Sequence, residues 1–288
     1  MSPGVSKNSF ESKLVKFANL RGRSKEHVER TVANVVLAQI IQMADPDATS
    51  QNFVKGGTGV LLRLGLSNGR ATGDLDMSMG LDRAGISDLV TALEGITWGD
   101  FHVATVKELR AKTKTKVAEE YRLKEFRVPL IYGASDWRTV RLEIARHELS
   151  LPDIPVEEFM DNEIIELFET LGLPQPRPIR LMPVELQIAQ KLHAMTETES
   201  ERGHDLFDVH SLVVENEPDI AKLANAVART FTYRGTHPWT SNLATTPKFQ
   251  EIYEIEVVDI ANAPTFEEAL ATVLNLMAQI DPYLTERK

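Results

Sequence analysis

The stretch that decides the fold is FVKGGTGVLLRLGLSNGRATGDLDMSM, which runs from Phe53 to Met79. A short apolar segment ends in a pair of glycines, and the following TGVLLRLGL has the apolar pattern of a helix. A loop of Gly, Asn and Arg comes next, and GDLDMSM then has the pattern of a strand, with Asp74 and Asp76 among apolar neighbours. We therefore expect a strand, a glycine turn, a helix and a second strand in close succession.

The two aspartates predict a cation site. Residues i and i+2 of a strand point to the same side, so the carboxylates of Asp74 and Asp76 converge. Converging carboxylates repel each other unless a cation lies between them. One or two carboxylates are what Mg²⁺ accepts when water and substrate phosphates complete its shell, and Mn²⁺ is a second candidate. A solvated strand without function is the alternative, but the nearby glycine turn favours a site.

The glycine turn supplies a matching anion site. Gly56 and Gly57 lie at the junction of strand and helix, where backbone N–H groups can approach a phosphate and the helix dipole adds positive charge. Thr58 adds a hydroxyl, and Arg70 either closes the loop before the aspartates or contacts a phosphate. A phosphate cradle beside a carboxylate pair predicts phosphoryl transfer. The run lacks the G-K-[ST] ending of a P-loop, which argues against that class of ATPase.

A third acid, Glu143 in TVRLEIA, would allow the site to hold two metal ions. It interrupts a strand that is otherwise apolar on alternate positions, which makes it a candidate metal ligand. The alternative is an exposed strand glutamate paired with Arg141. His193, His204 and His210 show no metal-ligand spacing, so we expect no zinc site among them.

The composition is that of a globular protein, with 288 residues, 42% hydrophobic and 26% charged. The absence of cysteine excludes disulfides and thiolate metal sites. No apolar run approaches the ~20 residues of a membrane span. The start of the chain, MSPGVSKNSF, has no signal-peptide core. We expect a cytoplasmic protein that does not enter the membrane.

The net charge of −10 argues weakly against extensive nucleic-acid binding, but its distribution is uneven. Basic residues gather between Lys107 and Arg127, whereas the last hundred residues are acidic. The alternating KTKTK places Lys112, Lys114 and Lys116 on one predicted strand face. That face is either a groove for a phosphate backbone or a solvated sheet edge protected by lysines.

The remaining pattern divides the chain in two. Ser24 is expected to cap a helix that ends near Met43, and GISDLVTALEGI predicts a helix beginning near Ser87. Between Trp98 and Arg146 the alternation is that of strands. After Pro152 we expect helices only, at 156–171, 183–195, 204–214, 220–230, 249–260 and 265–280. The Pro-rich link LPQPRPIRLMP suggests two domains, at 1–172 and 173–288. We expect an α+β protein. Its first domain would have N-terminal helices and a mixed sheet flanked by helices, and its second domain would be helical.

The order GGT then DLD resembles the core signature of the DNA polymerase β-like nucleotidyltransferases. More narrowly, FVKGGTGVLLRL with RATGDLD is similar to the AbiEii/MenT nucleotidyltransferase toxins of type IV toxin–antitoxin and phage-defence systems. The chain departs from that family twice, since Gly59 replaces an alanine and Thr72 replaces a serine. Both changes keep the small size or the hydroxyl. In this resemblance residues 1–172 form the nucleotidyltransferase domain, and Thr72 lies beside the metal and nucleotide.

A second motif of the family is matched by ELQIAQKLHAMTETESERGHDLFDVHSL. Its positions fall on Lys191, Arg202, Asp205 and Asp208, in the helical domain. The resemblance implies that Lys191 reaches the phosphates of an NTP and that an aspartate orients it. Asp205 and Asp208 are three residues apart on one helix face, and the sequence does not choose between them.

The resemblance implies a Mg²⁺-dependent enzyme that transfers an NMP from an NTP to RNA, plausibly to the 3′ end of tRNA, and so blocks growth. Its partners would be the NTP, the RNA and a cognate antitoxin protein. Asp74, Asp76 and Glu143 would bind metal, and Glu143 would activate the acceptor hydroxyl. The alternatives are a nucleotidyltransferase that modifies an antibiotic or a protein, and a catalytically inactive binding module.

Overall fold

The computed structural model describes residues 6–47, 51–109, 123–148 and 157–285. The predicted lysine cluster at Lys112, Lys114 and Lys116 lies outside these ranges. The chain divides into two compact units. Unit 1 comprises Met1–His147 and Val156–Leu181, and unit 2 comprises Glu148–Pro155 and Met182–Lys288.

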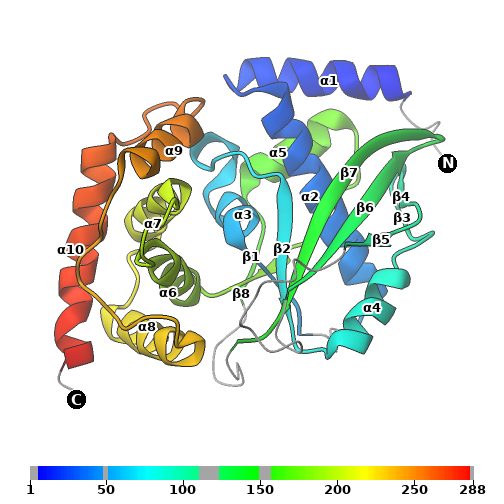
Figure 1. Cartoon of the computed structure of the whole chain (residues 1–288). Helices are drawn as coiled ribbons and strands as arrows, with labels where there is room; N and C mark the ends of the chain where they lie inside the picture. Colours follow the sequence, from blue (N-terminus) through cyan, green and yellow to red (C-terminus); the bar gives the residue numbers. More distant parts are fainter. Residues whose placement is uncertain (1–5, 48–50, 110–122, 149–156, 286–288) are drawn as a thin grey trace. The chain divides into compact units, whose positions relative to one another are not determined.

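Unit 1 is built on a mixed sheet (Figure 1). Its strands are β1 (Phe53–Lys55), β2 (Asp74–Met79), β3 (Thr97–Trp98), β4 (Phe101–Val103), β5 (Lys107–Glu108), β6 (Lys124–Tyr132), β7 (Ser135–Arg146), β8 (Glu157–Phe159) and β9 (Ile179–Leu181). Their order in the sheet is β3-β4-β6-β7-β2-β1-β9-β8, with β5 on β6. The central strand β2 runs parallel to β7 and antiparallel to β1.

The helices of unit 1 are α1 (Lys7–Leu20), α2 (Lys25–Ala44), α3 (Gly56–Asn68), α4 (Arg83–Thr91) and α5 (Asn162–Leu171). The side chain of Ser24 caps α2 by accepting a hydrogen bond from the His27 N–H at 3.2 Å, as the sequence predicts. Helix α3 follows β1 without an intervening loop, and β2 follows α3. The expected order of strand, glycine turn, helix and strand is therefore confirmed.

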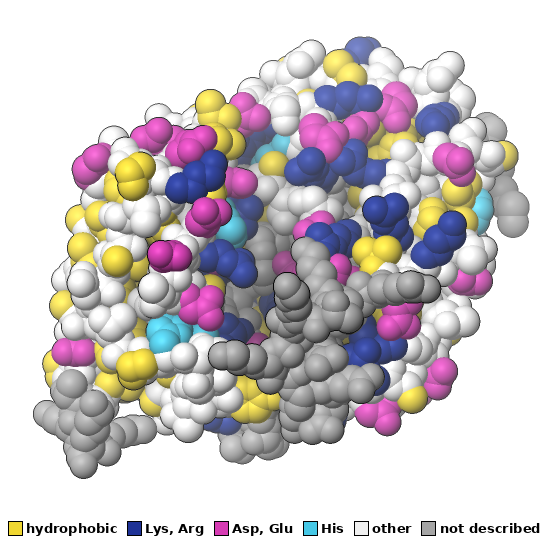
Figure 2. All heavy atoms as spheres, in the orientation of Figure 1, with side chains coloured by type: hydrophobic (Ala, Val, Ile, Leu, Met, Phe, Trp, Pro, Cys, Tyr) yellow, Lys and Arg dark blue, Asp and Glu magenta, His cyan; other side chains and the backbone are white. Residues whose placement is uncertain are grey.

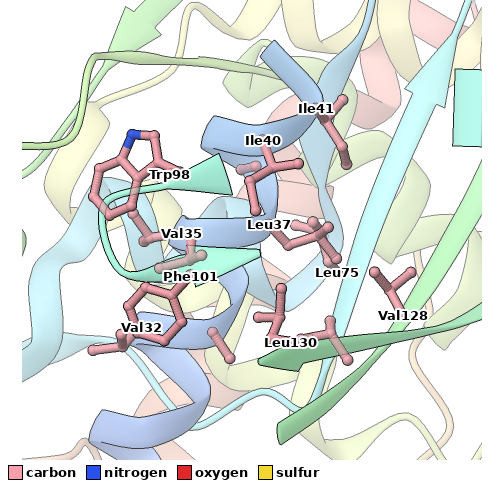
Figure 3. Packing of buried hydrophobic residues seen from close by; sticks show 14 of the residues in the cluster. Val32, Val35, Leu37, Ile40, Ile41, Leu75, Trp98, Phe101, Val128 and Leu130 are labelled. Atoms are coloured by element: carbon pink, nitrogen blue, oxygen red, sulfur yellow. The ribbon is translucent and has the colours of Figure 1, made fainter. Parts of the chain in front are cut away.

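One face of the sheet carries the core of unit 1. Helix α2 packs on β2, β3 and β7 and is buried along almost its whole length, because Val, Leu and Ile occupy most of its turns. Figure 3 shows Val32, Val35, Leu37, Ile40 and Ile41 of this helix facing strand residues that include Leu75, Phe101 and Leu130. Burial of this apolar surface fixes which face of each strand remains open, since strand side chains alternate.

Unit 2 is helical, as expected. Its elements are α6 (Val184–Met195), α7 (Gly203–Asn216), α8 (Ile220–Arg234), α9 (Pro247–Val257) and α10 (Phe266–Thr285). Helix α6 packs on α7 and α8, and α10 packs on α7, α8 and α9. Each of these helices lies within about five residues of its predicted bounds, because apolar side chains recur at helical spacing along it, and Asp219 and Thr246 cap α8 and α9. No helix of the described residues is long and apolar enough to cross a membrane.

Two expectations about the elements were wrong. The chain after Pro152 is not helical throughout, because residues 157–159 form β8 and residues 179–181 of the Pro-rich link form β9, which pairs in parallel with β1. The helix expected at 156–171 therefore begins only at Asn162. Helix α4 begins at Arg83 rather than near Ser87, because the side chain of Asp82 caps it.

Candidate active site

The predicted carboxylates of unit 1, Asp74, Asp76 and Glu143, lie on the open face of the sheet. Leu75 and Met77 in β2 point into the core, so Asp74 and Asp76 point the other way. The same alternation holds in β6 and β7, where the even-numbered residues from 126 to 130 and from 140 to 144 are buried. The odd-numbered residues of β6 and β7 therefore share one surface with the two aspartates of β2.

Strand register arranges the charges of this surface in two rows, which we call the acidic row and the basic row. In the acidic row, Glu125 of β6 lies opposite Glu143 of β7, and Glu143 lies opposite Asp76 of β2. In the basic row, Lys107 of β5 lies opposite Arg127 of β6, Arg127 opposite Arg141 of β7, and Arg141 opposite Asp74 of β2. The register thus brings Glu143 beside the aspartate pair, although these residues lie far apart in the sequence.

Burial and like charge act together on the acidic row. Burial, together with the negative charges of Asp76 and Asp74, raises the pKa of Glu143 to about 7, although Arg141 opposes the rise. Burial also raises the pKa of Asp74, and the charge of Asp76 adds to it against Arg141 and Arg30. A cluster of acids that binds protons this readily is short of positive charge, which is the electrostatic condition for binding a cation.

Arg141 provides positive charge next to the acidic row. Its Nη2 donates to Glu125 Oε2 at 2.5 Å, and its Nε lies 3.0 Å from Glu143 Oε1. The expected alternative, a strand glutamate paired with Arg141, is therefore present as an ion pair. The side chain of Glu143 is only 17% exposed, however, and it lies opposite Asp76, so the pair does not make it a solvated surface residue.

The glycines fit against this cluster. Gly56 has a φ of +61°, and a Cβ at this position would lie 2.0 Å from Asp76 Oδ2. A Cβ on Gly57 would lie 2.8 Å from Arg70 Nη2 and 3.1 Å from Thr72 Oγ1. Only glycine leaves room for the Asp76 carboxylate at the start of α3, and this close approach explains the paired glycines of the sequence.

Buried hydrogen bonds hold the start of α3 against β2. The Thr58 hydroxyl donates to the Asp74 carbonyl at 2.7 Å and accepts from Asn34 Nδ2 at 3.0 Å. Asn34 Nδ2 also lies 3.5 Å from the carbonyls of Thr72 and Asp74. Asn34 was not predicted, although a polar amide within the apolar run VANVVLAQII, which also holds Gln39, was a signal that could have identified it.

Lys191 lies in unit 2, where it is almost fully buried in α6. Its Nζ is 2.6 Å from Asp205 Oδ1 and 2.7 Å from Asp208 Oδ2, so both aspartates of α7 hold the ammonium group. Burial opposes ionisation of Asp205, but the charges of Lys191, His204 and Arg202 together outweigh it and lower the pKa of Asp205. Helix spacing of three residues brings both carboxylates to one lysine.

The donor set of unit 1 fits a divalent metal ion. Asp74 and Asp76 offer carboxylate oxygens on one strand face, which is the ligand type that hard cations prefer. Within the described ranges, no group of three or more His, Asp or Glu side chains is already arranged to hold an ion. Glu143 is held by Arg141 and is therefore not arranged as a third ligand beside Asp74 and Asp76. The aspartate pair is the core of the candidate site.

Comparisons with known proteins identify relatives of the chain. A family model described as "Nucleotidyl transferase AbiEii toxin, Type IV TA system" matches residues 40–274. None of the curated proteins compared with the chain matches it.

Two solved structures are similar to this fold. MenT4, a nucleotidyltransferase toxin from Mycobacterium tuberculosis H37Rv, has 15% sequence identity and a TM-score of 0.62, with 96% of this chain and 90% of that chain covered. A candidate nucleotidyltransferase from H. pylori has 17% identity and a TM-score of 0.44, with 99% of each chain covered. The likeness to MenT4 confirms the expected α+β fold.

Proposed function

Because the chain belongs to the AbiEii family of type IV nucleotidyltransferase toxins, we propose that it transfers an NMP from an NTP to an RNA acceptor. In this reaction an acceptor hydroxyl oxygen forms a bond to the α-phosphorus of the NTP. The bond between the α-phosphorus and its bridging oxygen to the β-phosphate breaks, and pyrophosphate leaves. Membership of the family implies an NTP as substrate and an antitoxin as partner.

The proposal gives each residue of unit 1 a role. Asp74 and Asp76 bind Mg²⁺, for which Mn²⁺ can substitute, and the metal supplies charge stabilisation for the phosphoryl group. Gly56, Gly57 and Thr58 hold phosphates through their backbone N–H groups, since the Thr58 hydroxyl is engaged by Asp74 and Asn34. Arg70 and Thr72 border this cradle at Gly57.

Glu143 is proposed to take the proton of the acceptor hydroxyl, with a further role as metal ligand. Its pKa of about 7 suits a base that works near neutral pH. When the proton is bound, Glu143 becomes neutral and its ion pair with Arg141 weakens. Arg141 then remains paired with Glu125.

The observation that carries the proposal is the position of Gly56 against Asp76. A glycine with positive φ places the start of a helix at the aspartate pair, and no side chain could occupy the intervening space. This arrangement supports a phosphate held at the helix N-terminus beside a carboxylate-bound cation. A structural strand does not require it.

Lys191, Asp205 and Asp208 keep a proposed role in NTP binding, which rests on the family motif. Their buried contacts support a lysine that is held charged and in one orientation. The finer identity of the acceptor, the tRNA 3′ end, is likewise proposed from the family. The basic row on the open face favours RNA over a cationic antibiotic, because like charges would repel such a substrate.

The test is incubation of the purified protein with each α-labelled NTP, Mg²⁺ and total cellular RNA. We expect one NTP to label a defined RNA, and the Asp76→Asn variant to label none. Replacing RNA with protein or an aminoglycoside in parallel reactions tests the other acceptors. If no NTP labels RNA while another acceptor is labelled, the proposed acceptor is wrong.

A further inference from the structure

We infer that the open face of β5, β6 and β7 binds the single-stranded end of the acceptor and directs its terminal hydroxyl to the aspartate pair. The inference rests on the proposed function, because it assigns a place to the acceptor of that reaction. Every residue that carries it lies in the described part of unit 1. Figure 2 shows Lys and Arg side chains gathered over this part of the molecule.

The surface is hollowed along the basic row. A groove of about 520 Å³ is lined by Lys107, Leu109, Arg127, Pro129, Thr139 and Arg141. A second groove of about 460 Å³ shares Lys107, Pro129 and Thr139 with the first, and it is also lined by Asp136 and by Arg138, which is paired with Glu26 and Glu29. The shared lining makes them one continuous track, which we call the basic track.

The charges of the track are unbalanced. Lys107 and Arg127 are exposed and lie opposite each other, and Arg127 also lies opposite Arg141. Like charges directly opposite on neighbouring strands destabilise a sheet. Among the described residues, neither Lys107 nor Arg127 has a carboxylate partner, in a chain whose net charge is −10. Two such cations side by side are the electrostatic complement of a phosphate backbone.

The track has a direction. Arg141 lies opposite Asp74, so one end of the track meets the candidate active site. Pro129 and Thr139 line the track beyond Arg127 and Arg141, away from the aspartates. The terminal nucleotide would therefore lie near Arg141, with the preceding nucleotides towards Pro129 and Thr139.

The lining favours a single strand over a duplex. Single-strand sites combine cations that follow the backbone with apolar and aromatic surfaces that contact sugars and bases. The basic track offers the apolar side chains of Leu109 and Pro129 between its cations. Bases paired within a duplex would not be free to use these surfaces, and a duplex end would not present its hydroxyl to the aspartates.

Binding of a labelled single-stranded RNA of roughly 12 nucleotides tests the inference, by fluorescence anisotropy in EDTA without NTP. The double variant Lys107→Glu/Arg127→Glu should bind more weakly than the parent. Its log–log salt slope should be less steep by roughly 1.4, from about 0.7 for each lost phosphate contact with a single strand. The matched control, Lys16→Glu/Lys222→Glu, makes the same change in net charge on exposed lysines of α1 and α8 and should bind like the parent.

Further measurements separate the outcomes. Thermal unfolding establishes that both double variants are folded. Equal binding by the parent and the Lys107/Arg127 variant at every salt concentration would overturn the inference, even if the RNA is labelled in the transfer assay. Equally tight binding of a duplex, or of a poly-glutamate peptide of the same charge, would also overturn it. Single-strand binding that depends on Lys107 and Arg127, without NMP transfer to any RNA, would instead refute the proposed function and leave the basic track supported.

Discussion

Glu143→Gln should stabilise the protein at alkaline pH while it lowers transfer activity. The acidic row has an excess of negative charge, and Glu143 is the member whose pKa is raised to about 7. Glutamine has nearly the same size but removes the charge. A residue that serves a metal or a reacting proton commonly reduces stability, so opposite effects on stability and activity are expected.

The magnitude follows from the pKa difference. The folded protein retains the Glu143 proton up to about pH 7, whereas the unfolded chain releases it near 4.5. This group's contribution to stability is therefore present below pH 4.5 and is lost as the pH rises to about 7. The whole difference corresponds to about 3 kcal/mol, which is an upper value because solvent screens the charge and Arg141 relaxes around it. The Gln variant has no such loss.

Urea unfolding of parent and variant, in EDTA at pH 5 and pH 8.5, measures the effect. At pH 8.5 the variant should be more stable by about 1.5 to 3 kcal/mol, and at pH 5 by less than about 1 kcal/mol. Mg²⁺ should then stabilise the parent more than the variant, if Glu143 is also a metal ligand. Glu158→Gln is the matched control, because Glu158 is an exposed strand glutamate paired with Arg180, at an N···O distance of 3.1 Å.

The reasoning would be refuted by a stability difference that is the same at both pH values. It would also be refuted by a variant that is less stable than the parent at pH 8.5, since the ion pair with Arg141 would then outweigh the repulsion. The free energy of unfolding of the Glu158→Gln control should differ from that of the parent by no more than about 1 kcal/mol at either pH, as expected for a surface ion pair.

Three further predictions concern the other residues of the site. Asp74→Asn or Asp76→Asn should reduce transfer by more than about 100-fold with no loss of thermal stability, and an active variant would contradict the metal assignment. Gly56→Ala should weaken Mg²⁺ binding and lower transfer activity, because the alanine Cβ would lie 2.0 Å from Asp76 Oδ2. Calorimetric titration with Mg²⁺ measures the loss of affinity. Lys191→Met should lower the free energy of unfolding by about 3 to 5 kcal/mol, because it removes the buried ammonium group that two buried aspartates contact, and unchanged urea unfolding would show that this ion pair contributes little to stability.

Local signals predicted most of the fold. The helices of unit 2 and the order of β1, α3 and β2 follow from apolar periodicity, caps and glycines within short windows. The short strands β8 and β9 were not predicted, because each has three residues and exists through pairing with distant partners. Three residues carry too little alternation to reveal a strand, and β8 and β9 lack the adjacent glycines that mark the end of β1.

The candidate site was predictable to a similar extent. Asp74, Asp76 and Gly56 are neighbours in the sequence, and the convergence of the two aspartates follows from strand periodicity. The pairing of Lys191 with both Asp205 and Asp208 required the packing of α6 on α7. Asn34 contacts the site through its side chain alone, from a helix that otherwise belongs to the core.

The two charged rows depend on a register that the apolar face determines. Leu75 lies opposite Leu142 and Met77 opposite Ile144, and all four are buried. A shift of one residue would turn these side chains to solvent, so burial excludes it. A shift of two would keep them buried but would place Arg141 opposite Asp76, which would join the basic row to the acidic row. Burial of the apolar face therefore excludes a shift of one, and the observed register is the one in which Glu143 joins the aspartates and Arg141 begins the basic track.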